Sequence, residues 1–342
     1  MKAIRFHHHG GPEVLRFEDA PDPAAGPGEV LIGVKATALN HLDLWIRKGL
    51  PGLSVGLPHI PGCDASGVVK AVGAGVTNVR PGDSVLINPG SSCGRCEFCL
   101  QGEESLCLRY TIVGEHRAGA CAELLVVPAP TVFPLPKGLS FEEGAAFPLA
   151  YLTAWRMVVG KGDVRPGQDV LIHAVGAGVG IASLQIAKSI GARVIVTASS
   201  EDKLRRAREL GADATIHNQN EDVEKRVKEI TARRGADVVI DYIAGPTWET
   251  SLRCARRGGR IVTCGATGGY DPKMPMAHVF YRQLQILGAT MGSAREFRAL
   301  YAAVAAGRFK PLIDRVLPLE KTREGEEALE KREVFGKVVI RV

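Results

Sequence analysis

The 342-residue sequence lacks the long apolar and basic runs that membrane and nucleic-acid partners require. It has no stretch of about 18 apolar residues, which is the length needed to cross a bilayer. Its net charge of +6 is not gathered into a long basic block, so nucleic acid is not an expected partner. No secretory signal is expected either, because the sequence begins with a predicted strand at residues 2–6. We therefore expect a cytoplasmic protein with no membrane contact.

Internal repeats and low-complexity segments are absent as well, and the remaining composition is that of an ordinary globular protein. Hydrophobic residues make up 45% of the chain and charged residues 23%. At this length the chain is expected to form two domains rather than one. The local pattern shows where they divide, because β-type segments precede residue 128 and alternating strands and helices follow it.

A glycine-rich turn in the middle of the chain is the most informative local feature. A short apolar strand at 170–172 leads into Gly176-x-Gly178-x-Gly180, and apolar residues then recur at helical spacing. A second strand at 193–197 completes a βαβ unit of about 30 residues. Glycines let a diphosphate approach the backbone, and the helix N-terminus holds its charge. A plain structural turn would also use glycine, but the position between strand and helix favours a dinucleotide site.

The alternation of strands and helices continues beyond this unit. Short apolar strands are predicted at 212–216, 236–241 and 259–264. Amphipathic segments separate them, at 201–210, 221–234 and 247–257. Repeated βα units with helices on both faces predict a doubly wound parallel sheet, which is an α/β fold.

The first 128 residues follow a different pattern, in which short β-type segments alternate with Gly and Pro turns. The predicted strands lie at 2–6, 30–36, 67–72, 84–87 and 122–127. This pattern predicts a compact, barrel-like β domain over residues 1–128.

A proline-rich connector then leads into the second domain, which we bound at 129–285. It begins with two predicted helices, at 141–147 and 150–159. Residues 286–342 are expected to return to the first domain through a strand at 286–289, a helix at 295–306 and a terminal strand at 335–340.

Four cysteines in a lobe at about 90–110 form the strongest chemical motif, Cys93-x2-Cys96-x2-Cys99-x7-Cys107. Four thiols at this spacing suit a closed tetrahedral zinc site, which leaves no position for substrate and is therefore structural. A disulfide pair and an iron–sulfur cluster are the alternatives. The missing secretory signal argues against the first, and the long final spacing, followed by Leu108 rather than Pro, argues against the second.

The order of these parts resembles the medium-chain dehydrogenase/reductase superfamily, which includes zinc alcohol dehydrogenases and quinone reductases. The resemblance covers essentially the whole chain and is carried by stretches such as Pro61-Gly-Cys-Asp-Ala-Ser-Gly67 and Arg80-Pro-Gly-Asp83. It implies a GroES-like β-barrel catalytic domain, a Rossmann domain and a cleft between them with the nicotinamide at its floor. It also implies a homodimer or homotetramer.

The sequence departs from the alcohol dehydrogenase pattern where that pattern holds a catalytic zinc. At the positions of a Cys, a His-Glu pair and a second Cys, this chain has Asn40, Cys63-Asp64 and Leu149. Leu42 replaces the hydroxyl that relays the proton of the alcohol. The spacing Asn40-x-x-Asp43 instead resembles the zinc-free quinone reductases. The residues expected to be catalytic are Asn40, Asp43, Cys63 and Asp64.

These departures indicate the substrate class. An unactivated alcohol must reach its alkoxide before it loses hydride, and a bound metal makes that feasible. A quinone or enone instead spreads the charge gained with hydride over its π system, so a hydrogen-bond donor such as Asn40 can stabilise it. The alternative for Asn40 and Asp43 is a structural hydrogen-bonded pair in the domain wall.

The end of the second strand of the glycine unit indicates the cofactor. NAD enzymes place an acid there, whereas this chain has Ala198, Ser199 and Ser200, with Lys203 able to hold a 2′-phosphate. NADP is therefore expected, and the nearby Glu201 and Asp202 leave NAD open. The expected cofactor-binding residues are Gly176, Ala177, Gly178, Val179, Ser199, Ser200, Lys203, Asn218, Gly265 and Lys337.

Three functions fit these observations. The first is NAD(P)H-dependent reduction of a quinone- or enone-type carbonyl substrate with only a structural zinc. The second is an alcohol dehydrogenase with an atypical catalytic metal at Cys63 and Asp64, joined by His41 or His59. The third is a non-catalytic NADPH-binding or nucleic-acid-associated protein. The ordered glycines and the expected cleft favour an enzyme.

Overall fold

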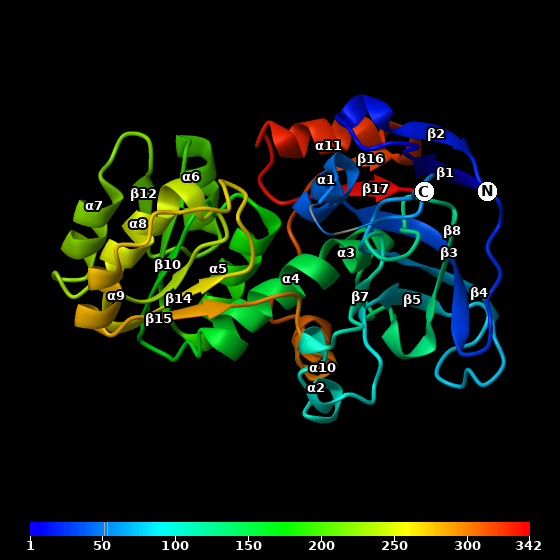
Figure 1. The fold of residues 1–342 in the computed structure, drawn as a ribbon, viewed down its shortest axis with the longest axis horizontal. Helices are drawn as coiled ribbons and strands as arrows, with labels where there is room; N and C mark the ends of the chain where they lie inside the picture. Colours follow the sequence, from blue (N-terminus) through cyan, green and yellow to red (C-terminus); the bar gives the residue numbers. More distant parts are fainter. Residues whose placement is uncertain (51, 53) are drawn as a thin grey trace.

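The computed structural model describes residues 1–50, 52 and 54–342, and its chain forms two domains side by side (Figure 1). Each domain is built on one large sheet. The predicted strand and helix types recur in the structure, with shifts of a few residues at their ends. Among the described residues, no helix has the length and apolar character needed to cross a bilayer.

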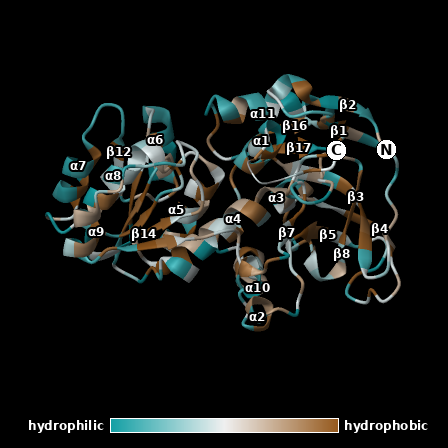
Figure 2. Ribbon diagram, in the orientation of Figure 1, coloured by the Kyte–Doolittle hydropathy of each residue, from teal (hydrophilic) through white to brown (hydrophobic). Residues whose placement is uncertain are grey.

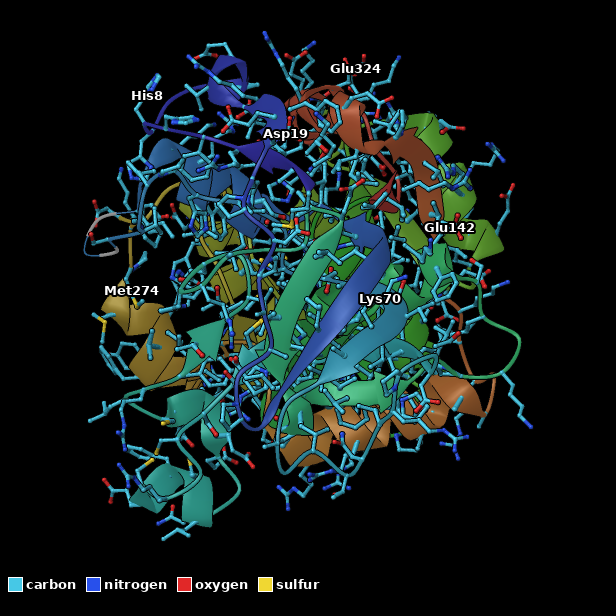
Figure 3. All side chains as sticks on the ribbon, turned by 90° about the vertical axis from the view of Figure 1, so that its right-hand side faces the viewer. His8, Asp19, Lys70, Glu142, Met274 and Glu324 are labelled. Atoms are coloured by element: carbon cyan, nitrogen blue, oxygen red, sulfur yellow. The ribbon has the colours of Figure 1, made fainter. Side chains whose placement is uncertain are left out.

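The first domain contains a seven-stranded sheet in the order β16-β17-β3-β4-β5-β9, with β8 also paired to β3. Its strands are β3 (Glu29–Ala38), β4 (Ser66–Val72), β5 (Ser84–Ile87), β8 (Leu124–Pro128), β9 (Val132–Pro134), β16 (Ile313–Pro318) and β17 (Lys337–Arg341). Figure 3 looks onto this sheet, with β3 and β8 side by side and Asp19, Glu142 and Glu324 toward the outside. The expected return of the chain to this domain is therefore present, because β17 pairs with β3.

Smaller elements surround this sheet. Two short sheets pair β1 (Lys2–Arg5) with β2 (Arg16–Asp19) and β6 (Gly90–Ser91) with β7 (Thr111–Ile112). The helices of this part are α1 (His41–Lys48), α2 (Glu97–Leu100), α3 (Phe141–Ala146) and α11 (Thr322–Glu330). Single 3-10 turns lie at Pro12–Val14, Glu104–Leu106, Ala129–Thr131 and Leu319–Lys321.

The second domain contains a six-stranded parallel sheet in the order β12-β11-β10-β13-β14-β15. Its strands are β10 (Asp169–Ile172), β11 (Arg193–Ala198), β12 (Ala214–His217), β13 (Ala236–Ile240), β14 (Ala255–Thr263) and β15 (Gln285–Gly288). This order is that of a doubly wound dinucleotide-binding fold, with the reversal beside β10. The central strands are buried on both faces, which explains their continuous apolar runs.

Helices cover the parallel sheet and join the domains. They are α4 (Pro148–Trp155), a following π-helix (Arg156–Lys161), α5 (Gly178–Ile190), α6 (Glu201–Glu209), α7 (Val223–Ile230), α8 (Gly245–Cys254), α9 (Met276–Arg282) and α10 (Ala294–Ala305). Figure 2 shows the brown, apolar strands inside and more polar helix surfaces outside. Helix α5 ends at Gly191, whose φ of 90° suits glycine at a helix C-terminus.

The structure differs from the sequence expectation at the end of the second domain. The predicted division after residue 285 falls inside β15, which pairs with β14 and is the sixth strand of the parallel sheet. The strand predicted at 286–289 was placed in the returning segment, and only its pairing with β14 shows that it belongs to the parallel sheet. Helices α1, α9 and α11 were not predicted, since each has only seven to nine residues.

Candidate functional site

A cleft of about 1040 Å³ lies where the two domains meet. Helix α1 and the start of α4 line one side, and the glycine turn and the carboxyl ends of β11, β13, β14 and β15 line the other. Ligands bind at this end of the strands in doubly wound folds. The expected cofactor-binding residues all line the cleft except Ser200, whose side chain caps α6 by accepting a hydrogen bond from the Lys203 amide.

Close packing requires glycine at the turn before α5. A Cβ on Gly180 would lie 2.4 Å from the Tyr242 hydroxyl, and one on Gly178 would lie 3.0 Å from Cδ of Lys337. Tyr242 donates a 2.7 Å hydrogen bond to the carbonyl of Ala174, a residue with φ of 51°. The amides at the α5 N-terminus are therefore held at the cleft wall, where they can bind a diphosphate.

The end of β11 is lined by hydroxyl and basic groups. Ser199 and Lys203 face the cleft, and Nζ of Lys203 donates a 2.6 Å hydrogen bond to the carbonyl of Arg332. Burial lowers the pKa of Lys203. Within the described residues, the acids that line the cleft are Glu115, in the first domain, and Glu330, which pairs with Arg47 and Lys48 of the first domain.

Asn40, Asp64 and Lys337 form a closed hydrogen-bonded triangle at the cleft floor. Nζ of Lys337 donates to Oδ1 of Asn40 at 2.5 Å and lies 3.2 Å from Oδ2 of Asp64. The side-chain amide nitrogen of Asn40, Nδ2, donates to the same Asp64 oxygen at 2.9 Å and to the Ala38 carbonyl at 3.1 Å. The other Asp64 oxygen accepts from the Leu149 amide at 2.8 Å. Both amide hydrogens of Asn40 are thus committed within the protein.

Asp43 and Cys63 lie behind this triangle rather than in the cleft wall. Asp43 is fully buried and accepts hydrogen bonds from the backbone amides of Asn40 at 2.7 Å and Gly62 at 3.0 Å. The bond from Asn40 is part of the capping box at the start of α1. Burial raises the pKa of Asp43 to about 6. The Cys63 thiol is also fully buried, 3.5 Å from Asp43, and its pKa is raised by that burial.

The four cysteines of the lobe come together as the motif predicts. Their sulfur atoms all lie within 4.8 Å of one another, with Cys96 and Cys93 at 3.5 and 3.9 Å from Cys99. Tetrahedral zinc with bonds of about 2.3 Å separates its sulfur ligands by about 3.8 Å, so the donor set fits one zinc ion. In the described part of the chain, this is the one group of three or more His, Cys, Asp or Glu side chains close enough to share a metal.

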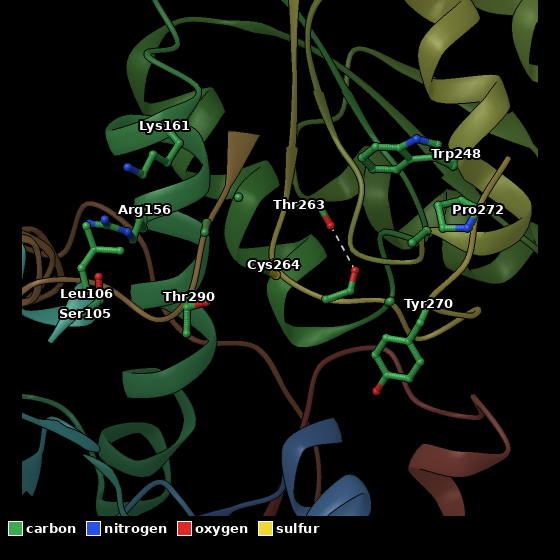
Figure 4. A pocket seen from close by; sticks show the side chains of 15 residues that line it. Ser105, Leu106, Arg156, Lys161, Trp248, Thr263, Cys264, Tyr270, Pro272 and Thr290 are labelled. Atoms are coloured by element: carbon green, nitrogen blue, oxygen red, sulfur yellow. Dashed lines mark hydrogen bonds between the residues drawn. The ribbon is translucent and has the colours of Figure 1, made fainter. Parts of the chain in front are cut away.

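The lobe is also tied to the second domain. Glu103 accepts a 2.6 Å hydrogen bond from Arg156, which donates at 2.8 Å to Glu296 of α10 as well. Ser105 lines both the main cleft and a side cavity of about 640 Å³. Figure 4 shows this side cavity with Arg156 on one flank and Tyr270 on the other.

Two titratable residues in the cleft wall, Glu115 and His116, were not identified from the sequence. They follow the short strand β7, and nothing in their local spacing marks them as a site. The Ile112 amide donates to Nδ1 of His116 at 3.2 Å, and the same nitrogen lies 3.8 Å from a carboxylate oxygen of Glu115. They are identified as cleft residues only in the folded structure, where the segment after β7 lines the cleft.

Comparison with known proteins agrees with this architecture. A zinc-binding dehydrogenase family model matches residues 178–306, and an alcohol dehydrogenase GroES-like domain model matches residues 26–137. A quinone oxidoreductase of Rattus norvegicus is 30% identical over 99% of this chain and 97% of its own length. An alcohol dehydrogenase of Geobacillus stearothermophilus is 32% identical over 96% of both chains. A solved structure of an NAD-dependent alcohol dehydrogenase is 53% identical, with a TM-score of 0.96 and full coverage of both chains. The chain therefore belongs to the medium-chain dehydrogenase/reductase superfamily of NAD(P)-dependent oxidoreductases.

Proposed function

We propose that the protein is an NADPH-dependent reductase of quinone- or enone-type carbonyl compounds, with zinc in a structural role only. The observation that supports this most strongly is the environment of Asp64. Its two oxygens already accept hydrogen bonds from Asn40, Lys337 and the Leu149 amide. An ammonium group this close competes with a metal cation for the same carboxylate, and the Cys63 thiol lies behind the floor rather than in it.

The chemistry of the floor suits an activated carbonyl. The bound nicotinamide cofactor would supply hydride. Negative charge then develops on the substrate oxygen, and a quinone or enone spreads that charge over its π system. Lys337 places a positive charge at the cleft floor, where it favours such an anion.

The roles of Asn40 and Asp43 follow from their hydrogen bonds. Both side-chain amide hydrogens of Asn40 are already used within the protein, so none is left for a substrate. We therefore assign Asn40 the role of positioning the Lys337 ammonium group, and not that of a hydrogen-bond donor to the substrate. Asp43 fixes the backbone at Asn40 and Gly62 and thereby the start of α1. Both residues then act by positioning the floor.

The nucleotide wall supports NADPH. A 2′-phosphate at the end of β11 would meet Ser199 and Lys203 and no neighbouring carboxylate in the described wall. The backbone amides at the start of α5, together with Lys337, would bind the diphosphate group of the cofactor. In the lobe, Cys93, Cys96, Cys99 and Cys107 would hold the zinc.

The proposal is tested with the purified protein, NADPH and 1,4-benzoquinone, followed by the loss of nicotinamide absorbance, together with metal analysis. We expect quinone turnover, one zinc per chain and weak or absent oxidation of simple primary alcohols. Two zincs per chain, with benzyl alcohol oxidation abolished by Cys63→Ser, would overturn the proposal. A protein that binds NADPH but turns over neither substrate would support the non-catalytic alternative.

Alcohol oxidation with NAD is the second candidate, because the 53% identical solved structure is named an NAD-dependent alcohol dehydrogenase. To oxidise an alcohol, the cleft would need an atypical metal site at Cys63 and Asp64 or another means of removing the proton of the alcohol. Parallel assays with NAD and NADP, each with and without added zinc, separate this candidate from the first. The homodimer or homotetramer remains a prediction, which sedimentation velocity would check.

A further inference from the structure

The side cavity of about 640 Å³ adjoins the main cleft beside the carboxyl ends of β14 and β15. Ligands bind at this end of the strands in doubly wound folds. The residues that line both spaces are Ser105, Cys264, Gly265, Ala266, Tyr270 and Thr290. A substrate whose carbonyl group lies at the cleft floor can therefore extend into the side cavity.

The side cavity is apolar on one flank and basic on the other. Figure 4 shows Trp248, Tyr270 and Pro272 on one flank, and Arg156 with Lys161 on the other. Among the described residues that line this cavity, two are basic and none is a carboxylate. A lining of this kind suits a ligand with an apolar body and a negatively charged end.

The π-helix Arg156–Lys161 places the two basic residues on the same wall. On an α-helix, residues five positions apart lie about 140° apart around the axis. The i→i+5 hydrogen bonds of a π-helix bring such residues closer to one face, and π-helices are rare and frequent at functional sites. The Gly162 amide donates one such bond to the Met157 carbonyl at 2.8 Å. A Cβ on Gly162 would lie 2.5 Å from that carbonyl oxygen, so this turn requires glycine.

Lys161 is the basic residue of this wall whose side chain is unpaired within the described part of the chain. Arg156 donates to Glu103 at 2.6 Å and to Glu296 at 2.8 Å, so its charge is matched within the protein. Neither carboxylate lines the cavity. Hydrogen bonding from Arg156 lowers the pKa of Glu103, and the charge of Lys161 lowers it further without a direct contact. An acidic group on a ligand would give the half-buried Lys161 a partner.

We propose, on the basis of the function proposed above, that the side cavity binds the remote arm of the carbonyl substrate and that this arm is apolar and ends in an acidic group held by Lys161. The carbonyl group then lies at the cleft floor, and the arm passes the residues shared by the two spaces. Trp248 and Pro272 contact its apolar part from the opposite flank. The substrate class is therefore an extended enone or quinone with a carboxylate or a similar anion at its far end.

The test compares three substrates with the full chain and NADPH, each followed by the loss of nicotinamide absorbance. The neutral enone 4-phenylbut-3-en-2-one has an apolar arm, its para-carboxylate adds the acidic end, and 1,4-benzoquinone has no arm. We expect kcat/KM of wild type for the acidic enone to be roughly tenfold above that for the neutral enone. Intrinsic reactivity cancels when this ratio is compared between variants.

Two variants separate the charge of the cavity from its space. Lys161→Gln should lower kcat/KM for the acidic enone by roughly tenfold and leave the other two substrates within about twofold of wild type. Gly288 lines the side cavity but not the cleft, and a Cβ there would meet no atom within 4 Å. Gly288→Leu should fill the cavity and lower kcat/KM for both enones by roughly tenfold, with 1,4-benzoquinone unchanged. Lys137→Gln, at an exposed lysine outside both spaces, should match wild type.

The outcomes distinguish the inference from the proposed function. Wild type that reduces all three substrates without preferring the acidic enone, or a Lys161→Gln variant that keeps the preference, would overturn the inference alone. Wild type that reduces none of them would overturn the proposed function, and titration calorimetry of the two enones with the NADP⁺-bound protein then decides the inference. Acidic enone that binds roughly tenfold more tightly to wild type, but not to Lys161→Gln, would support it. Equal binding of the two enones to wild type would overturn it.

Discussion

Nζ of Lys337 lies 3.2 Å from Oδ2 of Asp64, although the two residues are 273 positions apart in the chain. Both side chains are almost completely buried, with exposed fractions of 4% and 0%. A buried ammonium needs its counter-charge, because the low-dielectric interior does not solvate it. This ion pair therefore joins the returning C-terminal segment to the first domain at the floor of the cleft.

Replacing Asp64 with Asn should destabilise the protein. The variant keeps an acceptor for the Leu149 amide but leaves Lys337 without a negative partner, and we expect a loss of about 3 kcal/mol in the free energy of unfolding. Urea unfolding followed by circular dichroism measures this loss. The control is Asp163→Asn, at a half-exposed carboxylate, which should cost less than about 0.5 kcal/mol. Equal losses for the two variants would contradict the assignment.

The zinc lobe should be separable from nucleotide binding. Cys96→Ser removes one of four sulfur ligands, so we expect metal loss and faster proteolysis of residues 90–110, with NADPH affinity nearly unchanged. Elemental analysis and limited proteolysis measure these effects. Cys264→Ala, which removes a thiol outside the lobe, should keep the metal. A folded Cys96→Ser protein that no longer binds NADPH would show that the lobe also supports the nucleotide site.

Cofactor preference should depend on Lys203. We expect wild type to bind NADPH more tightly than NADH, and Lys203→Ala to weaken NADPH by roughly tenfold while leaving NADH unchanged. Fluorescence titration with both cofactors provides the comparison. Arg205→Ala, on the same helix but paired with Asp202 and Glu209, should change neither affinity. A clear preference of wild type for NADH would show that the turn at Ser199 was misinterpreted.

A buried ion-pair cluster should hold α1 to α11. Arg47 is fully buried, contacts Glu326 at 2.5 Å and Glu330 at 2.7 Å, and donates to the Gly10 carbonyl. Arg47→Met should cost about 3–5 kcal/mol, because it leaves a buried carboxylate unpaired. The double variant Arg47→Met/Glu326→Leu should recover most of this loss in the same urea experiment. No recovery would mean that the loss comes from packing rather than from charge.

His41 should make stability depend on acid pH. Its pKa in the folded protein is about 4, below the ordinary value of 6.5. Between these values the unfolded chain binds a proton that the folded chain does not, so the free energy of unfolding falls as pH falls from 6.5 to 4. We expect this fall to be about 2–3 kcal/mol smaller in His41→Gln. Thermal unfolding across this pH range measures it, and identical slopes for the two proteins would disprove it.

Local sequence patterns predicted much of the fold. Apolar runs gave strand β5 at its observed bounds, 84–87, and placed helix α10 within one residue. The glycine turn before α5 was recognised because strand, turn and helix follow one another directly. The four-cysteine group was also visible, since its ligands lie within fifteen residues.

The floor of the cleft was not predictable to the same degree. The spacing Asn40-x-x-Asp43 was interpreted as catalytic, but it is also the signature of a helix N-terminus, and the structure shows a capping box there. The contact of Asn40 with Lys337 joins residues 297 positions apart, and no local pattern reveals such a contact. Short helices such as α1 likewise depend on tertiary packing more than on their own sequence.

The pairing of β17 with β3 also sets an order of events during synthesis. The ribosome makes Lys337 297 residues after Asn40, which at roughly 5–20 residues per second is a delay of about 15–60 seconds. For that interval the edge of β3 and the Asp64 carboxylate have no C-terminal partner, while the whole parallel sheet emerges and can fold. The open edge of β3 is therefore available to other strands during that interval.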